Sequence, residues 1–164
     1  MKKILFLLLL SGLALSSCNR KTAQKNKKPK TTTKVVTKGV HFKKNESFAK
    51  VLKKAKATNK PIFIDFYTTW CAPCKWMDSD VFELKVVGDL FNDNFISLKV
   101  DAEKGEGPML AAQFGVRGYP MLVYLDSNGD MVDSQLGMTT ATNVMDKARR
   151  TITHNNAING AGSR

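Results

Sequence analysis

The stretch that decides the fold of this chain is Lys60-Pro-Ile-Phe-Ile-Asp-Phe-Tyr-Thr-Thr-Trp-Cys-Ala-Pro-Cys-Lys75. Its first half, residues 62–67, is a short apolar run rich in aromatic and branched side chains, which is typical of a strand buried on both faces. Its second half carries two cysteines three positions apart, Cys71 and Cys74, where a helix should begin. Pro73 fits the first turn of that helix, because the N–H that proline lacks would have no intrahelical partner there.

The position of the two cysteines indicates thiol–disulfide exchange. Cys71 would lie at the positive end of the helix dipole, which favours a thiolate over a thiol. Cys74, one turn further on, would be close enough to form a disulfide with it. A thiolate at a helix N-terminus, with a second thiol beside it, can exchange partners with a foreign disulfide.

The amino terminus has the pattern of a secretory signal. It begins with Met1-Lys2-Lys3, and the mostly apolar residues 4–15 cover only 12 positions, whereas a membrane span needs about 20. The segment ends in Leu15-Ser-Ser-Cys18, which resembles the lipobox of bacterial lipoproteins. That resemblance implies removal of residues 1–17 as a lipoprotein signal peptide and lipidation of the Cys18 thiol, which would anchor the protein to a bilayer. The alternative is an ordinary signal peptide cut nearby.

The cysteine count agrees with an exported redox protein. The chain has three cysteines, so lipidation of Cys18 would leave Cys71 and Cys74 as a pair, with none for a separate structural disulfide. Disulfides persist in exported compartments, where such a pair has substrates to act on. We therefore expect a protein of the bacterial cell envelope that faces the periplasm from the inner or the outer membrane.

The net charge of +12 is concentrated in one segment. Residues 18–40 contain eight Lys or Arg side chains, no acid and few apolar residues, so we expect a disordered basic tether. Its rms reach is roughly 25 Å, and its lysines would lie against anionic lipid headgroups. The remaining residues 41–164 have a net charge of only +2, because Lys2, Lys3 and the eight basic residues of 18–40 account for the other ten positive charges. This distribution argues against a nucleic-acid partner.

Residues 41–154 have the pattern of one α/β domain, and the polar residues 155–164 are expected to be a frayed tail. The pattern predicts strands over 62–67, 95–101, 121–125 and 131–136, and helices over 45–58, 72–82, 84–91, 109–114 and 139–152. The Asn-Gly turn within 126–130 predicts a hairpin between the last two strands. This order of elements predicts helices packed on a central mixed sheet.

Asp65 lies in the middle of the apolar strand, six positions before Cys71. Alternation places its side chain on the same face as Phe63 and Tyr67, where burial would raise the pKa of the carboxyl group. A carboxylate with a raised pKa near Cys74 can accept the proton when the second thiol attacks. The alternative is a buried aspartate with a purely structural role.

Pro120 directly precedes a predicted strand, although proline cannot donate to a sheet ladder. One solution is a cis peptide bond between Tyr119 and Pro120. It would turn the backbone of Tyr119 outward, to meet an extended substrate segment beside Cys71.

A Cys-x-x-Cys pair can also be half of a zinc site. Zinc needs about four ligands, and the two histidines, His41 and His154, lie near the ends of the domain. We therefore expect no metal and no cofactor. A non-catalytic module that carries zinc or copper on the Cys pair is the alternative to an enzyme.

Taken together, these motifs resemble the thioredoxin superfamily. The residues that carry the resemblance are Trp70-Cys-Ala-Pro-Cys-Lys75, Asp65, Val100-Asp101 and Gly115-Val-Arg-Gly-Tyr-Pro120. The run 76–82 and the Gly105-Glu-Gly107 loop are more similar to periplasmic thioredoxin-like proteins, including the C-terminal domain of the transmembrane disulfide reductase. The resemblance runs from about residue 42 to 152 and implies a thioredoxin-like three-layer α/β/α sandwich.

The resemblance also implies roles for individual residues. Cys71 would be the attacking thiolate, Cys74 the resolving thiol, Asp65 the buried proton acceptor and Pro120 the cis-proline, with Trp70 beside the active site. Thioredoxin has Gly-Pro between its cysteines, where this chain has Ala-Pro. Thioredoxin also places a lysine near the buried aspartate, at the position of Ser97 here. Either Lys99, on the same face, takes that place, or Asp65 has no counter-charge.

We expect a membrane-tethered thiol–disulfide oxidoreductase outside the cytoplasm that reduces protein disulfides. The Ala-Pro dipeptide offers neither the charge nor the hydrogen-bond donor that strong oxidants use, which favours a reductase over an oxidase or isomerase. A reductase in this compartment needs a membrane thiol carrier as electron donor. We further expect the protein to be a monomer.

Overall fold

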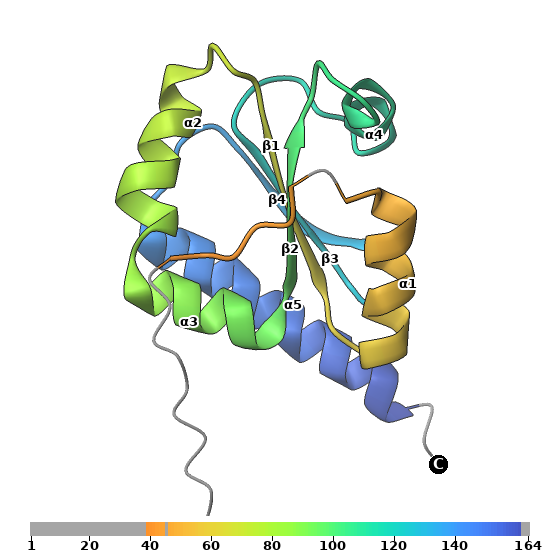
Figure 1. The fold of residues 1–164 in the computed structure, drawn as a ribbon. Helices are drawn as coiled ribbons and strands as arrows, with labels where there is room; N and C mark the ends of the chain where they lie inside the picture. The colour runs from red at the N-terminus through yellow and green to blue at the C-terminus, as the bar shows by residue number, and fades with distance from the viewer. Residues whose placement is uncertain (1–38, 45, 162–164) are drawn as a thin grey trace, which may run out of the picture. The chain divides into compact units, whose positions relative to one another are not determined.

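The computed structural model describes residues 39–44 and 46–161 (Figure 1). The predicted signal peptide, the lipidation site Cys18 and the tether up to residue 38 lie outside the described residues. Gly39 and Val40, which we assigned to the tether, belong to the folded domain, because the Val40 N–H donates to the Phe82 carbonyl at 2.8 Å and Val40 packs on the core. None of the helices in the described ranges is long and apolar enough for a membrane span.

The helices and strands follow in the predicted order (Figure 1). They are α1 (Phe48–Thr58), β1 (Ile62–Tyr67), α2 (Ala72–Met77), η1 (Asp78–Phe82), α3 (Lys85–Asn94), β2 (Ile96–Asp101), α4 (Gly107–Gln113), β3 (Met121–Leu125), β4 (Met131–Leu136) and α5 (Ala141–Ala161).

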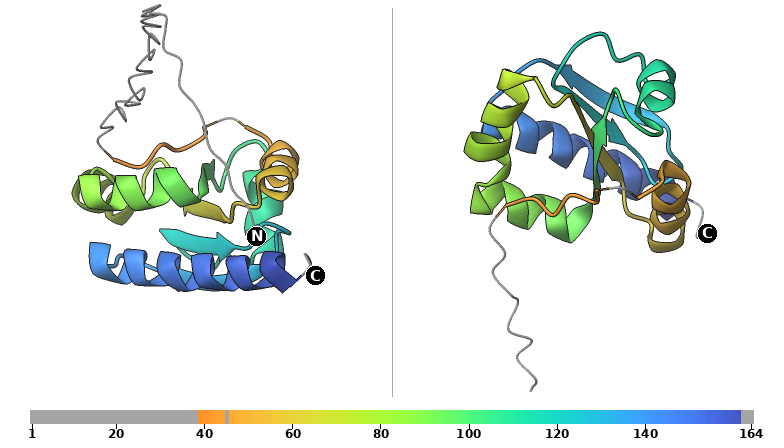
Figure 2. Two further views of the ribbon diagram at one scale, coloured as in Figure 1. Left: turned by 90° about the horizontal axis from the view of Figure 1, so that it is seen from below. Right: turned by 45° about the horizontal axis from the view of Figure 1, so that its top comes forward.

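Within the described residues the strands form one mixed sheet in the order β2-β1-β3-β4. β1 runs parallel to β2 and antiparallel to β3, and β3 and β4 form the predicted hairpin. One core cluster packs α1 and α4 on one face of the sheet, and a second packs α2, η1, α3 and α5 on the other. Figure 2 shows these layers in two further views. The predicted α/β/α sandwich with a mixed sheet is confirmed.

β1 is central because its side chains are apolar on both faces, apart from Asp65. Ile62, Ile64 and Phe66 belong to the core under α1 and α4. Phe63 belongs to the opposite core, where its ring packs within 6.0 Å of four other aromatic rings, between centroids. The predicted alternation therefore holds, and it places Asp65 on the face that α2 covers.

Three features differ from the sequence-based expectations. The helix after the cysteines changes to a π-helical turn at Asp78. Residues 41–43 run along the edge strand, where Lys43 forms a parallel bridge to Leu98. The predicted frayed tail is wrong as far as residue 161, because α5 continues to Ala161. Buried Asn155 holds it there, since its side chain bonds the Asn59 carbonyl at 2.9 Å and the Ser127 N–H at 2.8 Å.

Candidate active site

Cys71 and Cys74 form a disulfide, as the sequence predicted, with the sulfur atoms 2.05 Å apart. Cys71 is the N-cap of α2, and its Sγ accepts the Cys74 N–H at 3.1 Å. The Cys71 N–H donates to the Thr68 carbonyl at 3.2 Å, so the end of β1 fixes the start of the helix. A sulfur that accepts a backbone N–H at a helix N-terminus is stabilised as a thiolate once the disulfide is reduced.

The disulfide is almost covered. Cys71 is 3% exposed and Cys74 is 2% exposed, whereas the preceding Trp70 is 66% exposed. The two sulfur-bearing side chains are therefore largely shielded from solvent, while the aromatic side chain that precedes Cys71 in sequence is exposed.

Trp70 is held in place by two contacts. Its indole N–H donates to the Glu103 carboxylate at 3.0 Å, and its ring meets Tyr119 edge to face with centroids 6.0 Å apart. The Tyr119-Pro120 bond is cis, as predicted. The structure thus brings Trp70 and Tyr119 together next to Cys71. Sequence reasoning missed Glu103, although its place just after β2 puts it at the same end of the sheet as the end of β1.

Asp65 is 1% exposed, and Lys99 provides the counter-charge that sequence reasoning left open. Lys99 Nζ lies 2.7 Å from Asp65 Oδ2 and also contacts Asp78 Oδ1. The same ammonium sits over the Tyr67 ring, 4.8 Å from its centroid. In the described part of the chain, Asp65 Oδ1 has no hydrogen-bond partner. One oxygen of this buried carboxyl group is therefore paired and the other is free to hold a proton.

Burial acts in opposite directions on the pKa of Asp65 and the pKa of Lys99. Burial raises the pKa of Asp65, and it outweighs the opposing attraction of Lys99. Burial alone would lower the pKa of Lys99, but the attraction of Asp65 and Asp78 outweighs it and raises that pKa. Lys99 is therefore held as a cation, while Asp65 is a carboxyl group that takes up a proton readily. This is the direction of shift that the sequence predicts for Asp65.

Asp78 connects this charged cluster to the helix that carries the cysteines. Its N–H donates to the Cys74 carbonyl as the C-cap of α2, and its side chain is 45% exposed. The contacts therefore run from Asp65 through Lys99 to the helical turn after Cys74. Sequence reasoning did not find Asp78, although a position four residues after Cys74 lies on the same side of a helix.

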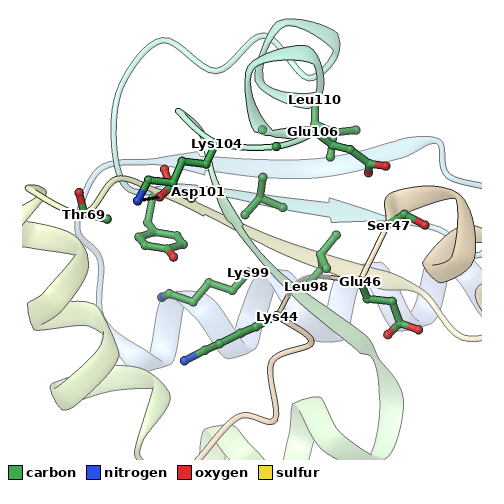
Figure 3. Close-up of a pocket in the computed structure, with 14 residues that line it drawn as sticks. Lys44, Glu46, Ser47, Thr69, Leu98, Lys99, Asp101, Lys104, Glu106 and Leu110 are labelled. Atoms are coloured by element: carbon green, nitrogen blue, oxygen red, sulfur yellow. Dashed lines mark ion pairs between the residues drawn. The ribbon is translucent and has the colours of Figure 1, made fainter.

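A surface cavity of about 560 Å³ borders the other side of Lys99 (Figure 3). It lies between the start of α1, the end of β2 and the loop before α4. Figure 3 shows the Lys99 and Lys44 side chains extending in the same direction, below the Lys104–Asp101 ion pair of 3.3 Å. Lys99 thus lines this cavity and also contacts the carboxyl group of Asp65.

The described residues hold no other arrangement typical of a catalytic metal. Across residues 39–44 and 46–161, no three His, Cys, Asp or Glu side chains are grouped as metal ligands. His154 lies 3.9 Å from Asp126, and His41 lies in a different part of the domain. Both sulfurs of the Cys pair are used by the disulfide.

Comparison with known proteins identifies the family. The model of a thioredoxin-like family matches residues 44–127. Thioredoxin 1 of Synechococcus elongatus is 32% identical over 90 residues, which are 53% of this chain and 78% of that protein. A solved structure from Bacteroides thetaiotaomicron, named as a candidate disulphide isomerase, is 38% identical with a TM-score of 0.62, over 70% of this chain and 94% of that one.

The thiol:disulfide interchange protein DsbD of Yersinia pestis is 31% identical over 96 residues. That match covers 58% of this chain but only 16% of DsbD, so it concerns one part of a much longer protein. The matched family, the fold and the Cys71–Cys74 disulfide agree with one another. The chain belongs to the thioredoxin-like family, as a thiol–disulfide oxidoreductase with a redox-active pair at Cys-x-x-Cys spacing.

Proposed function

We propose that this protein is a lipid-tethered reductase of protein disulfides in the bacterial cell envelope. The observation that carries the proposal is the Cys71–Cys74 disulfide at the start of α2, on a helix joined through Lys99 to the buried Asp65. Thiolate stabilisation, a resolving sulfur and a proton acceptor are the parts that disulfide reduction needs.

The first step is attack on the client. In the reduced protein, the Cys71 thiolate attacks one sulfur of a client disulfide. The client S–S bond breaks, its second sulfur leaves as a thiolate, and a mixed disulfide forms between Cys71 and the client. The Cys74 N–H and the start of α2 stabilise the Cys71 thiolate before attack.

The second step releases the client. The Cys74 thiol loses its proton to Asp65 and attacks Cys71 Sγ, which breaks the mixed disulfide. The client sulfur leaves as a thiolate, and the client, with two electrons gained, takes up one proton from Asp65 and one from solvent to become a dithiol. The protein is left with the Cys71–Cys74 disulfide seen in the structure. A donor must then return two electrons. We infer a membrane-embedded thiol carrier, because the envelope lacks the reducing pool of the cytosol.

Trp70, Tyr119 and Pro120 form the docking surface in this proposal. Trp70 is the exposed aromatic at the rim, and its contact with Tyr119 fixes the segment that enters β3. The cis bond at Pro120 presents the backbone of Tyr119 to an extended client segment. Client disulfides would then approach between Trp70 and the segment that enters β3.

The envelope location rests on the amino-terminal pattern, in which Cys18 follows a lipobox-like segment. Mass spectrometry of the N-terminal peptide from the native host tests the tether. We expect a diacylated or triacylated Cys18, and an unmodified peptide that begins elsewhere would contradict it.

A disulfide isomerase is the second candidate, because the Bacteroides thetaiotaomicron structure at 38% identity is named as one. An isomerase keeps its pair reduced and returns the electrons to the same client, so it needs a less reducing pair. Equilibration with glutathione separates the two. A reductase is expected near the thioredoxin value of about −270 mV, and an isomerase near about −180 mV.

Insulin disulfide reduction, coupled to an added dithiol donor, tests the proposed activity. The wild-type protein should reduce insulin, Cys71→Ser should abolish the activity, and Cys74→Ser should accumulate a mixed disulfide on Cys71. Activity that survives in Cys71→Ser would contradict the proposed mechanism.

A further inference from the structure

A second cavity lies at the opposite end of the sheet from the disulfide. It has a volume of about 300 Å³ and lies between the segment 41–43, the last turn of α1, the end of α3 and the start of β2. In Figure 1 the last turn of α1, the end of α3 and the start of β2 lie in the lower part of the picture, whereas α2 lies at the top. β1 joins the two ends, and its six residues span roughly 20 Å.

The lining of this cavity is strongly basic. His41, Lys43, Lys54 and Lys60 contribute to it, together with Thr58, Asn92, Phe95, Ile96 and Ser97. None of the described residues that line it carries a carboxylate. Across the described ranges, no ion pair joins these lysines to an acid. The cavity therefore has an excess of positive charge that the domain does not neutralise.

Ser97 provides an independent observation. It is only 4% exposed and lines the cavity, and its hydroxyl has no hydrogen-bond partner among the described residues. Buried hydroxyl groups without a partner are uncommon in folded proteins, because leaving one unpaired costs free energy. Because the oxygen has almost no accessible surface, the Ser97 side chain would have to rotate toward the cavity to bond a bound acceptor, and that bond would remove the cost.

The surrounding contacts keep the site in shape. The Lys43 N–H donates to the Ser97 carbonyl at 2.8 Å, and the Lys60 ammonium donates to the Asp93 carbonyl at 2.8 Å. The His41 N–H donates to Asn92 Oδ1 at 2.8 Å. Residues far apart in the sequence are thus fixed around one cavity that combines several cationic donors with a hydroxyl.

We propose that this basic cavity, lined by His41, Lys43, Lys54, Lys60 and Ser97, binds the phosphate-bearing headgroup of an anionic lipid. Lysine ammonium groups and a hydroxyl are suitable donors to phosphate oxygens. A phosphate is also available from solution, but the lipid source follows from the chain itself. Residues 18–38 carry eight Lys or Arg side chains and precede His41 closely in sequence, and the lipid proposed on Cys18 would keep the domain close to the bilayer.

Headgroup binding would orient the enzyme. With this end of the sheet against the bilayer, the disulfide at the other end faces away from the membrane toward soluble clients. The inference rests on the proposed membrane tether, and it adds to the tether a defined orientation of the domain.

The test uses NMR to follow the chemical shifts of the backbone amides of the full chain. The spectra are compared between nanodiscs of phosphatidylglycerol and nanodiscs of phosphatidylcholine. We expect shifts at Lys54, Lys60 and Ser97 with phosphatidylglycerol only. Lys54→Gln/Lys60→Gln should weaken this binding by about tenfold or more, since hydrogen bonds to charged groups are lost. The matched control Lys53→Gln/Lys56→Gln removes the same charge from exposed α1 positions outside the cavity and should change binding by less than about twofold.

Two results would overturn the proposal. One is an equal loss of phosphatidylglycerol binding in the control variant, which would mean that the lipid is attracted by diffuse positive charge and not by a defined site. The other is the absence of shifts at the cavity with phosphatidylglycerol. Inorganic phosphate is a separate arm, and strong binding of free phosphate with no response to the nanodiscs would reject the lipid source. Ser97→Ala gives a second variant, in which binding should weaken without any change in charge.

These outcomes are separable from those of the proposed function. Lys54→Gln/Lys60→Gln should leave insulin reduction unchanged, because neither residue lies near the disulfide. An unacylated Cys18 in the native host would reject the tether, whereas the nanodisc shifts report on the cavity directly. Loss of insulin reduction in this variant would contradict the separation of the two sites.

Discussion

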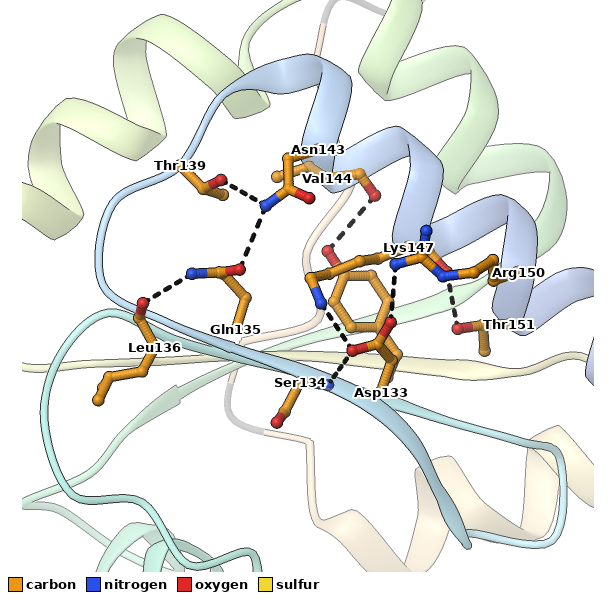
Figure 4. Close-up of polar contacts among 11 residues, drawn as sticks. Asp133, Ser134, Gln135, Leu136, Thr139, Asn143, Val144, Lys147, Arg150 and Thr151 are labelled. Atoms are coloured by element: carbon orange, nitrogen blue, oxygen red, sulfur yellow. Dashed lines mark hydrogen bonds and ion pairs between the residues drawn. The ribbon is translucent and has the colours of Figure 1, made fainter.

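Two carboxylates in this protein make the same contact with a lysine, yet their pKa values are shifted in opposite directions. Lys99 lies 2.7 Å from Asp65 under α2, and Lys147 lies 2.7 Å from Asp133 between α5 and β4. Arg150 adds a second contact to Asp133, at 3.0 Å. Figure 4 shows the Asp133 cluster, in which the cations reach down from α5 to the strand.

The difference lies in burial. The side chain of Asp65 is 1% exposed and that of Asp133 is 22% exposed. Burial raises the pKa of Asp65 in spite of Lys99. For Asp133, burial acts in the same direction, but hydrogen bonds from Lys147, Arg150 and the Ser134 N–H outweigh it and lower the pKa. The same ion-pair distance thus accompanies a raised pKa at Asp65 and a lowered pKa at Asp133.

The largest expected effect is on stability, when each carboxylate loses its lysine. Lys99→Met leaves Asp65 buried without a counter-charge and should lower the free energy of unfolding by about 3 kcal/mol at pH 7. Lys147→Met should cost less than about 1 kcal/mol, because Asp133 is partly solvated and keeps Arg150. Urea unfolding of both oxidised variants measures this. Equal losses would show that burial does not distinguish the two pairs.

The next effect is on catalysis. Asp65→Asn removes the proposed proton acceptor and should slow the resolution of the mixed disulfide by about 100-fold at pH 7, which is a typical loss for a general base. Asp133→Asn should leave that rate unchanged. Rapid-quench measurement of client release in a single turnover provides the rate. A wild-type rate in Asp65→Asn would mean that Asp65 has a structural role only.

The two carboxylates should also give opposite dependences of stability on pH. The pKa of Asp65 is raised by folding, so its contribution is fully present below the ordinary value of about 3.9 and is lost as the pH rises through the raised value. The pKa of Asp133 is lowered, so its contribution is present above the ordinary value and is lost as the pH falls through the lowered one.

Unfolding experiments between pH 3 and pH 8 test this contrast. The stability of the wild-type protein relative to Asp65→Asn should fall as the pH rises above about 4. Relative to Asp133→Asn, it should rise over the acidic part of the range and then stay constant. Parallel curves for the two variants would contradict the comparison.

The smallest effect concerns Asp78, which shares Lys99 with Asp65. Asp78→Asn removes a negative charge near Asp65 and should lower the pKa of Asp65, with at most about a threefold change in the resolution rate because water screens this half-exposed group. Asp80→Asn is the matched control, since Asp80 lies on the same helical turn and bonds Ser79 instead of Lys99. Equal effects of the two substitutions would exclude a specific role for Asp78.

Much of the fold was predictable because it depends on local patterns. The apolar run of β1, the Asn-Gly turn before β4 and the helical spacing in α1 each determine their element with little help from the rest of the chain. Three features of the site were also predictable, because each depends on residues only a few positions apart in the sequence. They are the Cys71–Cys74 pair, the buried face of Asp65 and the cis bond at Pro120.

The remaining features depend on contacts between distant segments. Lys99 reaches Asp65 only because β1 and β2 pair in register at these two residues. Asp78 and Glu103 acquire their partners from other elements, and the α5 extension is held by side-chain contacts of Asn155. The basic cavity combines residues from four separate segments. None of these contacts leaves a periodic pattern in the sequence.

The central claim is that burial makes Asp65 a carboxyl group that holds a proton more readily than an ordinary aspartate. Titration of the ¹³C-labelled carboxyl groups in the oxidised protein measures this directly, with Asp133 as an internal comparison in the same spectra. We predict that Asp65 titrates above the ordinary value of about 3.9 and Asp133 below it. An Asp65 carboxyl that titrates at or below that value would contradict the account.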